Sequence, residues 1–169
     1  ASAHDMGREH RIISSLRDTA VPVPATVGFC DDPAINGAPF YVMRYVDGHV
    51  VRDLETAHHL LTPAARLHAS ESLVDTMAAI HRVDLDVSGL TTLGKHDGYI
   101  QRQLKRWYGQ WMQQRTRDLA DVDRAHDLLT HMIPEQGPAT IVHGDYRLDN
   151  CMVDDFGEVV AVLDWEICT

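Results

Sequence analysis

The sequence predicts an α+β fold, with strands toward both ends of the chain and helices between them. Three observations lead to this prediction. Residues 3–17 have apolar side chains at helical spacing, and two segments rich in β-branched and aromatic residues follow them. Helical spacing returns over residues 62–133. Two short apolar runs, 151–153 and 159–163, then flank turn-forming residues, as in a β-hairpin.

The first predicted helix carries one acidic side chain on its apolar face. Met6, Ile12, Ile13 and Leu16 form that face. Glu9 lies about one helical turn from Met6 and from Ile13, so it points the same way. Burying an unpaired carboxylate is costly, and an inward Glu9 therefore needs a cationic partner. The alternative is that Glu9 lies at the rim and pairs with a neighbouring arginine.

Two strands separated by a turn are predicted next. The first lies around residues 25–29, after two prolines that enforce an extended backbone. Residues 31–37, "DDPAING", have the composition of a turn. The second strand, residues 39–46, is rich in aromatic and β-branched side chains and ends before Asp47 and Gly48.

The helical middle begins at Thr62 and Pro63, a typical N-cap followed by proline at the first helical position. His81 shares the predicted apolar face of this helix, and we expect a hydrogen-bonded core histidine there in preference to a metal ligand. The other members of that face are Leu67, Val74, Met77 and Ala78.

Two more helices, about 97–116 and 118–133, precede a short apolar strand that begins at residue 139. Trp107 and Trp111 form a stripe along the first of these helices. We expect the stripe to pack in the core, and the alternative is that it lines a substrate cleft.

Composition and charge exclude several classes of protein. Hydrophobic residues at 44% and charged residues at 24% are typical of a soluble globular protein, and no apolar run reaches the roughly 20 residues of a membrane span. A net charge of −10 argues against a nucleic-acid partner. It is compatible with a cationic substrate, or with an acidic surface of no specific role. Three cysteines without a Cys-x-x-Cys pair indicate reduced thiols in a cytoplasmic protein. The sequence gives no indication of oligomeric state.

The segment "HGDYRLDN", residues 143–150, has the spacing of a phosphotransfer loop. It places His143, Asp145 and Asn150 in the order His-x-Asp-x-x-x-x-Asn, and protein-kinase catalytic loops share this Asp-to-Asn separation. The spacing lets the aspartate face the hydroxyl being phosphorylated while the asparagine faces magnesium on the ATP phosphates. We expect His143 to hold the loop by hydrogen bonding, and Arg147 to contact the transferred phosphoryl group.

Two aspartates compete for the role of the second magnesium ligand. Asp155 belongs to a literal Asp-Phe-Gly, the magnesium motif of protein kinases. However, the strand at 151–153 moves the chain roughly 10 Å away from Asn150, and the strand at 159–163 returns to bring Asp164 back beside it. We therefore expect Asp155 at the exposed tip of the hairpin. Asp164 and Asn150 supply the oxygen ligands that magnesium prefers.

The segment "IVHGDYRLDNCMVDDFGEVVAVLDWE" resembles the catalytic segment of the aminoglycoside phosphotransferase family, which are kinase-like small-molecule phosphotransferases. "GREHRIISSL" resembles the N-lobe helix of that family, and "PFYVMRYVDG" its last N-lobe strand and hinge. "MAAIHRVD" and "RQLKRWYGQW" resemble helices of the branch fused to acyl-CoA dehydrogenases. The resemblance covers essentially the whole chain. It implies a protein-kinase-like two-lobed fold, with an N-lobe remnant at 1–46 and a helical C-lobe, carrying the catalytic loop and metal-binding hairpin, at 47–169.

The resemblance also implies ATP and Mg²⁺ as cofactors and assigns residues to them. Glu9 matches the helix glutamate that pairs with a strand lysine in the family. Met43 would line the back of the adenine pocket. The backbone of Arg44, Tyr45 and Val46 would hydrogen-bond the adenine edge.

The chain departs from the family pattern at two places. The family's Gly-rich phosphate loop and strand lysine should precede Glu9, and the sequence has neither. The helices that normally follow Asp164 are missing as well. We therefore expect a kinase-like fold incomplete at both ends, a piece of a larger protein that binds ATP poorly by itself. Glu166 reaches either a second ion or only the solvent.

Three functions fit these observations. The first is ATP-dependent phosphorylation of a small-molecule hydroxyl, and the acyl-CoA-dehydrogenase-related branch favours a metabolic compound over an antibiotic. The second is a catalytically silent, kinase-like nucleotide-binding module. The third is a metal-dependent hydrolase that uses Asp145, Asp149 and Asp164, which leaves Glu9 and the hinge strand unexplained.

Overall fold

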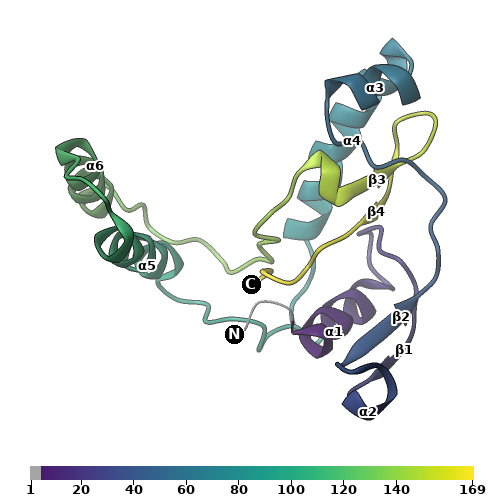
Figure 1. Cartoon of the computed structure of the whole chain (residues 1–169), viewed down its shortest axis with the longest axis horizontal. Coiled ribbons are helices and arrows are strands. Elements are labelled where there is room, and N and C mark those ends of the chain that lie inside the picture. The colour runs from purple at the N-terminus through teal and green to yellow at the C-terminus, as the bar shows by residue number, and fades with distance from the viewer. Residues whose placement is uncertain (1–4) are drawn as a thin grey trace. The chain divides into compact units, whose positions relative to one another are not determined.

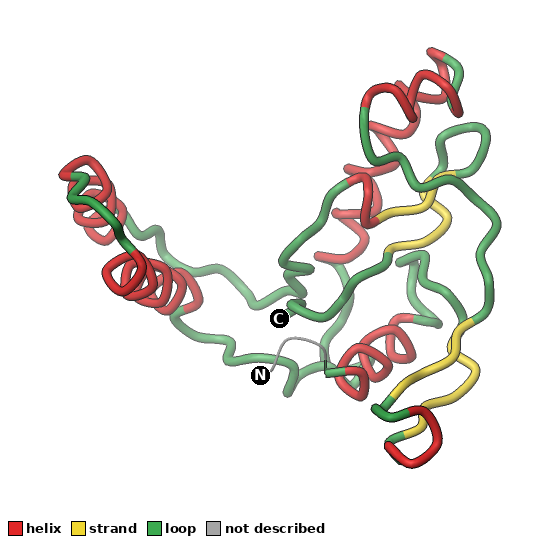
Figure 2. Tube along the Cα trace, in the orientation of Figure 1, coloured by secondary structure: helices red, strands yellow, loops and turns green. Residues whose placement is uncertain are grey.

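The computed structural model describes residues 5–169 and mixes helices with short strands, as predicted (Figure 1). Figure 2 shows these elements along the trace, with long loops between several of them. Residues 3 and 4 of the first predicted helix lie outside the described residues. The helices are α1 (Met6–Leu16), α2 (Pro33–Asn36), α3 (Leu54–Leu60), α4 (Pro63–His81), α5 (Tyr99–Gln114) and α6 (Ala120–His131), with a 3₁₀ turn at Leu148–Asn150. The strands are β1 (Thr26–Cys30), β2 (Phe40–Met43), β3 (Cys151–Val153) and β4 (Val159–Val162).

The chain divides into two compact units. One contains the described residues up to Leu93 together with Thr140–Thr169, and the other is Gly94–Ala139. The second unit is a pair of helices, α5 and α6, joined by a stacked Tyr108 and His126 whose ring centroids are 3.8 Å apart. These two units do not correspond to the N-lobe and C-lobe that we predicted on either side of residue 46. That lobe boundary stays a prediction.

Helix α1 packs against the β1–β2 pair. Asp5 caps the helix by accepting a hydrogen bond from the Arg8 amide at 3.0 Å, which satisfies one of its unpaired N-terminal donors. The two strands are antiparallel, with Cys30 opposite Phe40 and Thr26 opposite Met43. On the helix, Ile12, Ile13 and Leu16 are buried together with Glu9. The prediction that Glu9 shares the inward face is therefore confirmed.

The predicted hairpin is present as β3 and β4. Cys151 lies opposite Val162, and Val153 lies opposite Val159 across one irregularity in register. Both edges of the hairpin are used: the backbones of His49 and Val153 exchange two hydrogen bonds, and the Val162 amide donates to the Pro22 carbonyl at 2.9 Å. The hairpin is therefore fixed on both sides by segments distant in sequence.

Helix α4 lies against the hairpin at very short range. Gly157, at φ +92°, sits so close that a Cβ there would be 2.1 Å from the Ala65 carbonyl oxygen. The Ser72 hydroxyl accepts a hydrogen bond from the Val159 amide at 2.9 Å in the buried contact. The α4 residues at this contact are small, namely Ala65, Ala69 and Ser72. Thr76 and Ile80 are the other buried residues of the helix.

The predicted apolar face of α4 is therefore wrong. Leu67, Val74 and Met77 point outward with exposed fractions of 65%, 58% and 39%. His81 is also exposed, so it is not a core histidine. The larger apolar residues repeat at helical spacing, but the close backbone contact with the hairpin selects the face of small residues.

Other elements differ from the predictions as well. The backbone at residues 139–143 is not a strand, although the Val142 amide and carbonyl pair with Thr169. The second predicted strand ends early, at Met43, and the "DDPAING" turn contains the short helix α2. Trp107 is 58% exposed and Trp111 is half-buried, so the stripe is not core in the described residues. No helix formed by residues 5–169 has both the length and the apolar character of a membrane span.

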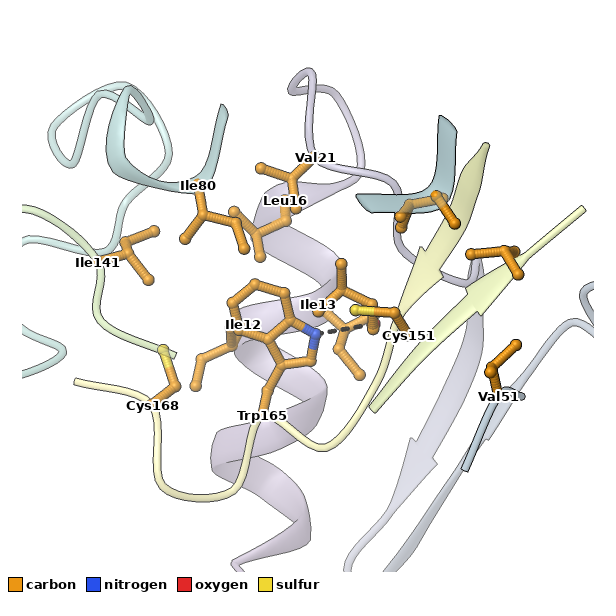
Figure 3. Close-up of a cluster of buried hydrophobic side chains, with 14 of the residues drawn as sticks. Ile12, Ile13, Leu16, Val21, Val51, Ile80, Ile141, Cys151, Trp165 and Cys168 are labelled. Carbon is orange, nitrogen blue, oxygen red and sulfur yellow. Dashed lines mark hydrogen bonds between the residues drawn. The ribbon is translucent and has the colours of Figure 1, made fainter. Parts of the chain in front are cut away.

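The core of the first unit is built around Trp165 (Figure 3). This side chain is completely buried, and Figure 3 shows it between Ile12 of α1, Ile80 of α4 and Cys168. The indole nitrogen donates to the Val162 carbonyl at 3.0 Å, so the polar end of the ring is satisfied inside the core. The residue that follows Asp164 is thus a central packing element.

Candidate active site

His143 fixes the start of the 143–150 loop, as predicted. The ring is 3% exposed and packs 4.6 Å from the Trp165 ring, centroid to centroid. Its Nε2 lies 2.9 Å from the Leu163 carbonyl oxygen, and its Nδ1 accepts from the Asp145 amide at 3.4 Å. This arrangement requires a neutral ring with the proton on Nε2. Burial lowers the pKa of His143, which favours the same neutral form.

Asp145 and Asn150 face each other across the loop. The Asn150 side-chain nitrogen donates to both the backbone carbonyl and the Oδ2 of Asp145, each at 2.9 Å. These bonds close the loop and leave the Asn150 amide oxygen as the acceptor atom of that side chain. The Asp145 side chain is 46% exposed. It combines a fixed orientation with access to a reactant.

Arg147 contacts the acidic residues on either side of it. Its Nη2 lies 2.6 Å from Asp149 Oδ2, and its Nε lies 3.6 Å from Asp145 Oδ2. Asp149 is therefore held in an ion pair. The guanidinium is 59% exposed, so it borders Asp145 at the surface of the loop.

The hairpin separates the two competing aspartates as predicted. The Leu163 amide donates to the Asn150 carbonyl at 2.8 Å, so Asp164 follows the residue paired with Asn150. Asp155 lies in the turn at the other end, with a side chain that is 82% exposed and 2.7 Å from His49 Nε2. Topology therefore brings Asp164, and not Asp155, next to the 143–150 loop.

Asp164 has an unusual backbone conformation. Its φ is +62°, the one positive value among the non-glycine residues described. Such a left-handed conformation is unfavourable for most residues and persists only where the surroundings impose it. The neighbours on both sides are fixed, since the Leu163 carbonyl contacts His143 and Trp165 is fully buried.

Glu9 of α1 contacts the residue after Asp164. Its Oε1 accepts a hydrogen bond from the Trp165 amide at 3.1 Å, and the Tyr41 hydroxyl bonds to the same carboxyl group. Within residues 5–169, the hydrogen bonds to Glu9 therefore come from two neutral donors and not from the cation that we expected. Burial raises the pKa of Glu9, and the charges of Asp164 and Glu166 add to the rise. Burial and Glu9 together raise the pKa of Tyr41 to about 12.

The predicted hinge follows β2 directly. Met43 is 40% exposed and Tyr45 is 86% exposed. The Arg44 amide donates to the Ala25 carbonyl at 2.8 Å, which continues the pairing of β2 with the preceding strand. Val46 is half-buried. The structure thus brings Glu9 into contact with the segment that contains Asp164. The role of residues 43–46 as a nucleotide-binding hinge stays a prediction.

The donor set fits a magnesium ion. The Asn150 amide oxygen and the Asp164 carboxylate are hard oxygen ligands on adjoining segments, and magnesium is commonly held by one or two carboxylates plus phosphates and water. Among residues 5–169, no group of three or more His, Cys, Asp or Glu side chains is arranged to hold a metal ion by itself. A site of this kind depends on the phosphates of a nucleotide to complete it.

Sequence reasoning missed three residues that position this site. Tyr41 was assigned only to a strand, Trp165 only to the segment after Asp164, and Arg8 to no role. The Arg8 guanidinium donates to the Glu166 and Cys168 carbonyls. Two of these residues are next to predicted site residues in the sequence, Arg8 beside Glu9 and Trp165 beside Asp164. This adjacency was the signal that could have identified them.

The fold and this loop define the class of protein. A helix-and-strand segment with an inward glutamate, a His-Gly-Asp loop and a returning hairpin is the arrangement of kinase-like small-molecule phosphotransferases. The model of the phosphotransferase enzyme family matches residues 1–169. The chain belongs to this family.

Two comparisons with named relatives agree with the family match. The chain is 37% identical to acyl-CoA dehydrogenase family member 10 of Mus musculus over 169 residues, which is 99% of this chain and 16% of that protein. It is 32% identical to acyl-CoA dehydrogenase family member 11 of Homo sapiens, again over 99% of this chain and 21% of that protein. The chain therefore spans only a small part of these relatives.

Solved structures share the fold. A protein of Ralstonia eutropha, described provisionally as an aminoglycoside phosphotransferase, superposes with a TM-score of 0.88 at 37% identity, over 97% of this chain and 50% of that one. The GDP complex of aminoglycoside 2'-phosphotransferase-IIIa gives a TM-score of 0.68 at 15% identity, over 96% of this chain and 56% of that one. This second likeness concerns the fold alone.

Proposed function

We propose that the protein transfers the γ-phosphoryl group of ATP to a hydroxyl group of a small molecule. The observation that carries the proposal is the double hydrogen bond from Asn150 to Asp145, formed where the hairpin returns Asp164 to the loop. One group that would accept a proton and two that would bind the metal then lie on adjoining segments. This is the constellation that phosphoryl transfer needs.

Asp145 would orient the substrate hydroxyl and accept its proton. The hydroxyl oxygen forms a bond to the γ-phosphorus while the bond from that phosphorus to the β–γ bridging oxygen breaks, and ADP leaves with the electron pair. Mg²⁺ held by Asn150 and Asp164 would neutralise charge on the phosphates. Arg147, already beside Asp145, would contact the transferred group.

The nucleotide base would bind at the hinge. Because the Arg44 amide is engaged with Ala25, the backbone groups of Tyr45 and Val46 are the better candidates for the adenine edge, with Met43 behind it. Glu9 would act from α1 by holding the Trp165 amide next to Asp164.

The acceptor would be a metabolic hydroxyl compound and not an antibiotic. The names of the relatives support this preference, since they are acyl-CoA dehydrogenase family members and 37% to 32% identical to this chain. Hydroxyacyl compounds, sugars, choline-like alcohols and aminoglycosides form the panel to test. We expect ADP release with a hydroxyacyl or other metabolic alcohol and none above background with aminoglycosides.

Replacing the proposed base gives the sharpest test of the reaction. In the full-length protein, Asp145→Ala should lower turnover by about a hundred-fold to ten-thousand-fold, the usual contribution of a positioned general base. Affinity for the nucleotide without Mg²⁺, measured by calorimetry, should change little, because Asp145 is proposed to contact the acceptor hydroxyl and not the nucleotide. Turnover that survives this substitution would refute the proposal.

A catalytically silent nucleotide-binding module is the second candidate. The observation that favours it is that the described hydrogen-bond partners of Glu9, the Trp165 amide and the Tyr41 hydroxyl, are both neutral. Binding of Mg-ATP without turnover against the whole panel would select this candidate. A metal-dependent hydrolase is disfavoured, because Asp149 is paired with Arg147 and the described carboxylates form no three-membered metal cluster.

A further inference from the structure

The Arg8 side chain joins helix α1 to the segment that follows Asp164. Its Nη1 donates to the Glu166 carbonyl at 3.1 Å, and its Nη2 donates to the Cys168 carbonyl. A third, longer contact runs from Nη2 to the Leu93 carbonyl at 3.4 Å. The side chain is half-buried, and all three acceptors are backbone atoms.

The chemistry of arginine suits this position. A guanidinium is planar, always charged, and has several N–H groups directed along fixed lines, so it can hold two carbonyls at once. Lysine presents one compact ammonium group on a flexible stem and cannot reproduce that fork. The pattern of donors is therefore specific to arginine, because the acceptors of these three contacts are backbone carbonyls.

Glu9 and Arg8 act on successive parts of the same segment. Glu9 accepts from the Trp165 amide, whereas Arg8 donates to the carbonyls of Glu166 and Cys168. Two adjacent residues of α1 thus fix the backbone immediately after Asp164. On the other side, the Leu163 amide and carbonyl are held by Asn150 and His143.

Asp164 lies between these two sets of anchors. Its φ of +62° is a conformation that the surroundings have to impose. If the anchors after Asp164 were released, the backbone would relax and the position of the carboxylate relative to the 143–150 loop would change. A metal ligand whose supporting bonds are lost binds its ion about ten-fold to a hundred-fold more weakly.

We propose that Arg8 is a positioning residue for the metal ligand Asp164. Through the Glu166 and Cys168 carbonyls it ties the position of α1 to the geometry of the metal site. This inference rests on the proposed function, because it takes Asp164 to be a metal ligand. It makes Arg8 a determinant of metal affinity, although the side chain touches neither the metal nor the substrate.

The same helix offers a matched control. Arg11 lies one turn further along α1, and its Nη2 donates to the Gly89 carbonyl at 2.8 Å and to the Thr92 hydroxyl at 2.9 Å. It therefore also joins α1 to a loop through a guanidinium. Its partners belong to residues 89–92 and not to the segment after Asp164.

The experiment compares Arg8→Lys with Arg11→Lys in the full-length protein. Binding of Mn²⁺ in the presence of a non-hydrolysable ATP analogue is followed by electron paramagnetic resonance, at a temperature where both variants are folded. We expect Arg8→Lys to weaken Mn²⁺ binding by about ten-fold or more. Arg11→Lys should change it by less than about two-fold. Hydrogen exchange at residues 164–168 should accelerate only in Arg8→Lys.

Equal effects of the two variants, or unchanged Mn²⁺ affinity in Arg8→Lys, would overturn the inference. If Arg8→Lys does not fold, Arg8→Gln, which keeps a planar donor group, is measured in the same way and judged by the same criterion. The readout needs no turnover. A wild type that binds Mn²⁺ and nucleotide but transfers no phosphoryl group would refute the proposed reaction and leave Arg8 to be judged by affinity. A wild type that binds neither would refute both.

Discussion

The two ends of the β3–β4 hairpin both carry an aspartate, but they are connected to the molecule in different ways. At the turn, Asp155 is 82% exposed and contacts one side chain, His49. At the open end, Asp164 has a left-handed backbone and follows a residue held by Asn150 and His143. The Asp-Phe-Gly tripeptide of the protein-kinase magnesium motif lies at the turn, whereas Asp164 lies at the open end, next to the 143–150 loop. Position in the fold, and not the local tripeptide, is therefore our reason for proposing Asp164 as the metal ligand.

Removing the carboxylate at one end of the hairpin or at the other should produce the largest difference in turnover. In the full-length protein, Asp164→Ala should reduce magnesium-dependent turnover by at least about a hundred-fold, because a metal ligand and its charge are removed. Asp155→Ala should change turnover by less than about two-fold, since exposed pairs such as that with His49 contribute little. Steady-state ADP release at saturating Mg²⁺ measures both. A larger defect in Asp155→Ala would reverse our assignment of the two ends.

The turn end should matter for folding instead. Gly157→Ala places a Cβ 2.1 Å from the Ala65 carbonyl oxygen at a φ of +92°, so α4 and the hairpin have to separate. We expect a loss of about 2–4 kcal/mol in unfolding free energy, from the clash and the left-handed backbone together. Gly28→Ala, where a Cβ meets nothing within 4 Å, is the control. Urea unfolding that shows the same stability for both variants would contradict the close approach of α4.

Substituting Glu9 should give the smallest of these effects, seen in the pH dependence of stability. It tests whether the carboxyl group that contacts the segment after Asp164 is buried in its protonated form. Its pKa is raised by burial above the ordinary 4.5, so the stability that Glu9 contributes is complete below pH 4.5 and is lost as pH rises through the raised pKa. Glu9→Gln keeps the oxygen that accepts from Trp165 but does not titrate.

The measurement is urea unfolding of this chain in metal-free buffer over a pH series from 4 to about 8. The stability of the wild type relative to Glu9→Gln should fall with rising pH, by up to about 1.4 kcal/mol for each pH unit between the two pKa values. A difference that stays constant with pH would mean that Glu9 is not buried as an acid. A difference that grows with pH would mean that Glu9 is stabilised as an anion.

The hairpin and the site around it were predictable because they depend on local rules. A strand of three residues, a turn of Asp and Gly, and a returning apolar strand determine which residues are neighbours. The inward position of Glu9 followed in the same way from helical spacing. The hydrogen-bonding role of His143 was predictable because the loop spacing assigns the predicted catalytic position to Asp145.

The buried face of α4 could not be predicted, because it is determined by a partner distant in sequence. Large apolar side chains on one side of the helix suggested the core, whereas Gly157 and Ser72 show that the hairpin backbone packs on the other side. Arg8 was missed for a similar reason. Its partners are backbone carbonyls, and no sequence pattern marks a carbonyl as an acceptor for a particular arginine.

Trp165 has a consequence for how the protein responds to heat. The indole is completely buried, and the residue directly before it is the exposed Asp164. We therefore expect warming that loosens the packing around the ring to displace the adjacent Asp164 carboxylate while the helices are still formed. Thermal inactivation should accordingly coincide with loss of the near-ultraviolet circular dichroism of the aromatic residues, ahead of any change in helical content.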